Sequence, residues 1–117
     1  MRICTFSLGG EARVGVLFGE QIADLTLAFA LSFKDLDAEE ALEAAEEIVA
    51  DTCEELLSDL ESTRLITDAA LKALGALKRK KQPFVFDGFP VVFDPDNVEV
   101  LPPVSEVTLF CMARNYV

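Results

Sequence analysis

Apolar residues recur at steps of three and four through a strongly acidic stretch in the middle of the chain. Residues 35–68 contain 13 Asp or Glu side chains and a single base, Arg64. The apolar residues at this spacing are Leu42, Ala45, Val49, Cys53, Leu56 and Leu60. The period is that of one face of an α-helix, and Asp37 with Glu40 three residues later resembles a capping box at its start. The pattern predicts an amphipathic helix whose acids face solvent.

A second helix is predicted from about Ser62 or Thr63. Its apolar residues are Leu65, Ile66, Ala69, Ala70, Ala73, Leu74 and Leu77. It ends in four cations, residues 78–81, where the negative end of the helix dipole favours positive charge, and Pro83 stops it. Residues 37–80 are therefore expected to hold two longer helices.

Extended segments flank the helices. Residues 1–25 are expected to form an antiparallel β-meander with turns at Gly9-Gly10 and Gly19-Glu20, after which Asp24 or Thr26 would cap a short helix over residues 27–31. Residues 84–101 are predicted to contain strands separated by turns at residues 87–88 and 94–97. The expected fold class is α+β, with an N-terminal meander, two longer helices and C-terminal extended strands.

The last residues combine an apolar run with polar side chains. Residues 107–113 are apolar apart from Thr108, as in a strand covered on both faces. Arg114, Asn115 and Tyr116 then place a cation, an amide and a phenol at a strand end, where a scaffold presents groups to a ligand. These three are the candidate substrate-site residues. A frayed terminus explains them equally well.

Composition narrows the function classes. The 117 residues carry a net charge of −11, which disfavours binding to nucleic acid or to anionic membranes. The chain has no histidine, the commonest general base and metal ligand, and its three cysteines are scattered, so no catalytic or metal site is expected within it. No signal peptide or membrane span is apparent, and three buried thiols would be consistent with a reducing cytoplasm.

Five segments of the chain resemble the fumarylacetoacetate hydrolase family. They are residues 1–6 (MRICTF), 12–17 (ARVGVL), 22–25 (IADL), 98–104 (VEVLPPV) and 109–116 (LFCMARNY). Each is weakly specific alone, and their order and spacing across nearly the whole chain make the resemblance moderately specific.

The resemblance implies that the full protein has two domains with different roles. Residues 1–104 would be an N-terminal accessory domain, and residues 105–117 would begin a catalytic domain missing from this chain. In the family that domain supplies carboxylates that hold Mg²⁺ or Mn²⁺ and a His a few residues after Asn-Tyr. The full enzyme would hydrolyse, decarboxylate or isomerise acylpyruvate-like dioxo acids, with the metal acting as a Lewis acid. This chain alone would be inactive, its partner would be its own catalytic domain, and a homodimer is possible.

A different class of function also fits the residues. The acidic helix would recruit a basic partner, and the chain would then be a protein-interaction module without catalysis. Binding through that face would weaken sharply above physiological ionic strength.

Overall fold

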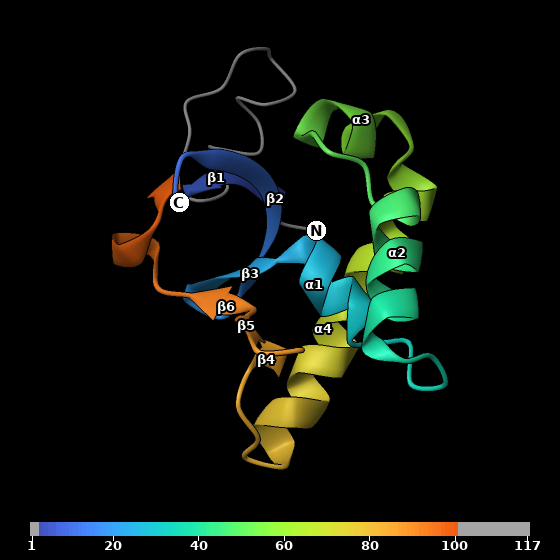
Figure 1. Cartoon of the computed structure of the whole chain (residues 1–117). Helices are drawn as coiled ribbons and strands as arrows, with labels where there is room; N and C mark the ends of the chain where they lie inside the picture. Colours follow the sequence, from blue (N-terminus) through green and yellow to red (C-terminus); the bar gives the residue numbers. More distant parts are fainter. Residues whose placement is uncertain (1–2, 101–117) are drawn as a thin grey trace.

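The computed structural model describes residues 3–100 (Figure 1). Over these residues the chain has the predicted α+β fold, with a sheet on one side and helices on the other. The first part contains β1 (Ile3–Leu8), β2 (Glu11–Phe18), β3 (Gln21–Asp24), α1 (Leu25–Ala30), α2 (Ala38–Ile48), α3 (Cys53–Ser58) and α4 (Leu60–Arg79). The remainder contains β4 (Val85–Phe86), β5 (Phe89–Pro90), β6 (Val92–Phe93), the 3₁₀ helix η1 (Pro95–Asn97) and β7 (Glu99–Val100).

The N-terminal meander is confirmed, and two-residue turns set its register. Gly9 and Gly10 join β1 to β2 with φ angles of 62° and 87°, a left-handed backbone that glycine adopts without steric cost. Leu8 therefore pairs with Glu11, and the whole of β1 lies antiparallel to β2. Phe18 pairs with Gln21 in the same way across the next turn.

Short strands from the end of the described region add to both edges of the meander. β6 pairs with β3 and β7 pairs with β1, which gives the strand order β6-β3-β2-β1-β7. Residues 94–98 connect β6 to β7, and three of them form η1. Such a connection reaches about 17 Å, at about 2 Å per 3₁₀ residue and about 3.5 Å per extended one. The outer strands of a flat five-stranded sheet lie about 19 Å apart, so the sheet curls, as its strands do in Figure 1.

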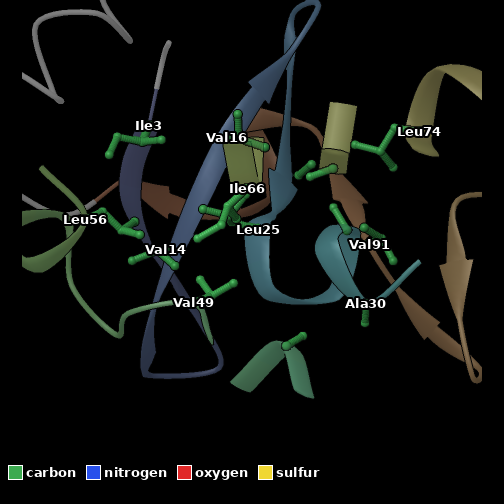
Figure 2. Close-up of a cluster of buried hydrophobic side chains, with 14 of the residues drawn as sticks. Ile3, Val14, Val16, Leu25, Ala30, Val49, Leu56, Ile66, Leu74 and Val91 are labelled. Carbon is green, nitrogen blue, oxygen red and sulfur yellow. The ribbon is translucent and has the colours of Figure 1, made fainter. Parts of the chain in front are cut away.

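The helices cover one face of this curled sheet and form the main core with it. The sheet contributes Ile3, Val14 and Val16, all at most 3% exposed. Side chains from all four helices, among them Leu25, Leu56, Ile66 and Leu74, pack against them, as does Val91 before β6 (Figure 2).

The opposite face of the meander has its own smaller core. Cys4, Phe6 and Ile22 are buried there, and the half-buried Phe93 packs its ring 5.9 Å from that of Phe6. Gly15 makes room for them, because a Cβ atom at this position would lie 2.9 Å from Cγ2 of Ile22 and 3.0 Å from the Phe6 ring. Burial on both faces holds the sheet in one register.

The first predicted helix is divided in the structure, so the prediction of one continuous helix through residue 60 is wrong. α2 ends at Ile48, Val49 has an extended backbone, and α3 begins after Thr52. Oγ1 of Thr52 accepts a hydrogen bond from the Glu55 N–H at 3.2 Å, so Thr52 caps a new helix. Val49 and Cys53 are still buried, because the turn between the two helices keeps the apolar stripe against the core.

The second predicted helix, α4, begins earlier than expected. Asp59 is its N-cap, since Oδ1 of Asp59 accepts a hydrogen bond from the Ser62 N–H at 3.2 Å. Ile66, Ala70 and Leu74 are buried at steps of four, as the periodicity predicts. The C-terminal end also agrees, with Arg79 as the last helical residue.

The segment between the predicted turns at residues 87–88 and 94–97 contributes strands to two sheets. Asp87 and Gly88, both with positive φ, form the turn of a separate hairpin of β4 and β5. β6 then joins the large sheet. Within residues 3–100, no helix has the length and apolarity needed to cross a membrane.

Candidate functional site

The residues that the sequence singles out for a substrate site lie outside the described part of the chain. Arg114, Asn115 and Tyr116 all follow residue 100, as do the expected strand over residues 107–113 and the domain boundary between residues 104 and 105. Their roles remain predictions.

The described residues place a buried ion pair where β2, β3 and α1 meet. The Nε atom of Arg13 donates a hydrogen bond to Oδ2 of Asp24. The Asp24 side chain is 2% exposed and that of Arg13 is 27% exposed, so the carboxylate is shielded from water and the guanidinium only partly. Arg13 also contacts Oε1 of Glu11 through Nη1 at 3.3 Å.

Local structure holds Asp24 in place from several directions. Its Oδ1 atom accepts a hydrogen bond from the Leu27 N–H at 3.2 Å and so caps α1, which confirms Asp24 rather than Thr26 as the cap. Its own N–H donates to the carbonyl of Val91 at 2.8 Å, beside β6. Asp24 therefore ties the meander, the first helix and the C-terminal strands together.

The surroundings of Arg13 act on its pKa in opposite directions. Burial lowers the pKa, whereas the hydrogen bond from Arg13 to Asp24 and the attraction of the Asp24 and Glu11 carboxylates raise it. Burial is the largest single effect, but the hydrogen bonds and the attraction together outweigh it, so the pKa of Arg13 lies above its ordinary value. A guanidinium that stays protonated does not act as a general acid or base, and both Asp24 oxygens accept hydrogen bonds. We therefore assign the pair a structural role.

A groove runs past this ion pair. One cavity of about 290 Å³ and a second of about 560 Å³ share Glu11, Arg13 and Glu46, and we call the two together the Arg13 groove. The first cavity is also lined by Leu8, Asp24, Leu27, Leu42, Phe89 and Pro90. The second is also lined by Ala12, Val14, Thr26, Val49, Ala50 and Asp51. The groove is thus apolar toward Phe89 and acidic toward Asp51.

A further cavity, of about 710 Å³, lies near the end of α4. Phe18 and Phe84 meet there edge to face with ring centroids 5.5 Å apart, and Nζ of Lys78 lies 5.9 Å from the centroid of the Phe18 ring. Nε2 of Gln21 donates a hydrogen bond to Oδ1 of Asp94 at 3.0 Å. These contacts pin the β2–β3 turn to α4 and to the segment before η1, which is a structural role.

The acidic side chains of residues 35–68 lie at the surface, whereas the two cysteines of residues 3–100 lie in the interior. All 13 acids of residues 35–68 are exposed, as the amphipathic pattern predicts. Cys4 and Cys53 are buried, and Oγ1 of Thr5 donates a hydrogen bond to Sγ of Cys53 at 3.4 Å. Within residues 3–100, no three His, Cys, Asp or Glu side chains converge as the ligands of a metal ion would.

The Arg13–Asp24 pair was not predicted, although the sequence contains a signal for it. A two-residue turn at residues 19–20 aligns Gly15 with Asp24 across β2 and β3. Arg13 is then the diagonal cross-strand neighbour of Asp24, within reach of a long side chain. The sequence contains no comparable signal for the Arg13 groove, because the residues that line the groove come from segments far apart in the sequence.

Comparison of the chain with protein-family models, with curated proteins and with solved structures finds no match in any of the three.

Proposed function

We propose that this chain contains the N-terminal accessory domain of a fumarylacetoacetate hydrolase family enzyme and that residues 105–117 begin the catalytic domain. The proposal rests on the resemblance of five sequence segments in a consistent order. In the full enzyme the catalytic domain would carry out metal-dependent hydrolysis, decarboxylation or isomerisation of acylpyruvate-like dioxo acids.

One observation supports the accessory role most directly. The segments 12–17 and 22–25, both part of the resemblance, meet through the ion pair of Arg13 with Asp24. Asp24 is engaged in capping α1 and in joining β3 to the segment before β6. Residues of these two segments therefore stabilise the fold, as we expect of an accessory domain.

The proposal assigns the metal to the catalytic domain. Arg114, Asn115 and Tyr116 would approach the substrate from the accessory side, and the whole enzyme would work in the cytoplasm, alone or as a homodimer.

An activity assay tests whether catalysis requires the catalytic domain that this chain is proposed to lack. The purified chain of 117 residues is incubated with an acylpyruvate and either Mg²⁺ or Mn²⁺, and loss of the dioxo acid is followed by its ultraviolet absorbance. We expect no turnover above that of the metal alone. Turnover that depends on both the chain and the metal would contradict the proposal that the chain lacks its catalytic part.

The full exposure of the 13 acids of residues 35–68 favours a second candidate function, an acidic protein-interaction module. Such a module would bind a basic protein through α2 and α3. Its affinity would fall steeply as ionic strength rises above physiological values, because the Debye length, about 8 Å at physiological ionic strength, then becomes shorter. Affinity that does not change with salt would contradict this second candidate.

A further inference from the structure

The Arg13 groove has features of a binding site that the scaffold alone does not require. Its apolar end exposes two large side chains, with Phe89 57% exposed and Leu8 39% exposed. The half-buried Leu27 and Leu42 line the same cavity. Aromatic side chains, Phe included, are enriched at protein–protein interfaces, where they pack against apolar surface of the partner.

The acidic end of the groove carries negative charge that the fold does not neutralise. Arg13 is engaged by Asp24 and Glu11. Among residues 3–100, no ion pair involves Glu46 or Asp51, which are both exposed and line the groove. A ligand there gains by bringing positive charge.

We propose that the Arg13 groove binds a segment of another protein in which an apolar side chain adjoins Lys or Arg. The apolar side chain packs against Phe89, Leu8 and the floor beneath them. The basic side chain pairs with Glu46 and Asp51. The inference goes beyond the accessory-domain proposal, and it rests on the second candidate function, to which it gives a defined site.

Charge decides which occupant fits. The chain carries a net charge of −11, so a second copy is repelled at long range whereas a basic partner is attracted. The acids of α2 and α3 extend this field beyond the groove, which steers a basic segment toward it. A basic segment of a different protein is therefore the occupant.

Three capped tetrapeptides serve as probes of the full chain. Leu-Phe-Lys-Arg carries both features, Ser-Ser-Lys-Arg keeps only the charge, and Leu-Phe-Glu-Glu keeps only the apolar part. Binding is followed by amide chemical shifts in NMR at low salt. We expect Leu-Phe-Lys-Arg to bind tightest and to shift the resonances of Glu46 and Phe89.

Matched variants separate the groove from the rest of the acidic surface. Glu46→Lys should weaken Leu-Phe-Lys-Arg binding at least about tenfold and should strengthen Leu-Phe-Glu-Glu binding. Glu55→Lys makes the same charge change on α3, outside the groove, and should have a much smaller effect. Phe89→Ser should also weaken binding, whereas Val85→Ser, an exposed residue of the same hairpin, should not. Circular dichroism confirms that each variant is folded.

Three results would overturn the inference. Equal losses for Glu46→Lys and Glu55→Lys would show that the acidic surface binds as a diffuse field, which rejects the groove and leaves the second candidate function standing. No binding of either basic peptide would reject both. A sedimentation result in which the chain is a dimer that Glu46→Lys dissociates would make a second copy the occupant.

Discussion

At the scale of single residues, the fold depends most on Asp24. Its carboxylate is 2% exposed, pairs with Arg13 and caps α1. Removing one partner of a buried ion pair is strongly destabilising, because the charge that remains is buried without compensation. The contribution of this site is therefore seen most clearly by removing the partner and leaving Asp24 in place.

Arg13→Met makes that change. We expect it to lower the free energy of unfolding by about 3 kcal/mol, at the lower end of the range for buried pairs because Arg13 is partly exposed. Urea denaturation followed by circular dichroism measures the loss. Arg64→Met, at an exposed arginine of α4, should change stability by less than about 0.5 kcal/mol. Equal losses in the two variants would contradict a special role for the pair.

Gly15 is the other residue at which a small change should matter. In Gly15→Ala the new Cβ meets Ile22 at 2.9 Å and the Phe6 ring at 3.0 Å, so we expect a loss of about 1–3 kcal/mol from overpacking. Gly75→Ala in α4 is the control, because its Cβ would meet only Nη1 of Arg79, at 3.6 Å. That variant should gain up to about 1 kcal/mol from helix propensity. Thermal unfolding of both variants gives the comparison, and a stabilised Gly15→Ala would show that the second core does not need the glycine.

At the scale of elements, capping side chains determine where the helices begin. Asp37, Thr52 and Asp59 each accept a hydrogen bond from the backbone N–H three residues later. The apolar period continues through Val49 and Cys53 and does not reveal that the chain turns there. The division between α2 and α3 was therefore not visible in the periodicity, although Thr52 before two glutamates is a recognisable cap.

The cap of α4 makes the stability depend on pH. The pKa of Asp59 lies below its ordinary value of 3.8, because the backbone N–H and the hydroxyl of Ser62 hydrogen-bond to the ionised carboxylate. A lowered pKa in the folded state means that this stabilisation is complete above the unfolded pKa and is lost as the pH falls through the folded pKa.

Asp59→Asn tests this assignment because Asn caps a helix without titrating. We expect the variant to lose less stability than the parent chain between about pH 5 and the acid limit. An NMR titration of the parent chain should give Asp59 a pKa below 3.8. A pKa at or above 3.8, together with identical acid unfolding of the two proteins, would contradict the cap.

At the scale of the whole molecule, local sequence patterns predicted the individual strands and helices better than they predicted how these elements are arranged in space. The paired glycines and alternating residues of 3–24 were enough to predict the meander, since two-residue turns fix the register. The placement of β6 and β7 on opposite edges was not predictable, because each strand has two residues and pairs with a partner far away in the sequence. The Arg13 groove was hidden for the same reason, since Glu11, Glu46 and Phe89 come together only in the folded chain.

The charge distribution is the property of the whole molecule that the sequence predicted best. Residues 35–68 carry a local charge of −12, and every one of their acids is exposed on the helical side. This surface is common to the interaction-module function and to the proposed groove. The accessory-domain function instead requires a catalytic domain on the C-terminal side of residue 104.

The nucleotide sequence downstream of the Val117 codon tests the central proposal most directly. If the chain is the front of a fumarylacetoacetate hydrolase family enzyme, the reading frame continues into a His within a few residues of Tyr116, and later into a Glu-x-Glu motif and a distant Asp. A stop codon immediately after Val117, or a continuation without these residues, would contradict the accessory-domain proposal and leave the acidic interaction module as the function to pursue.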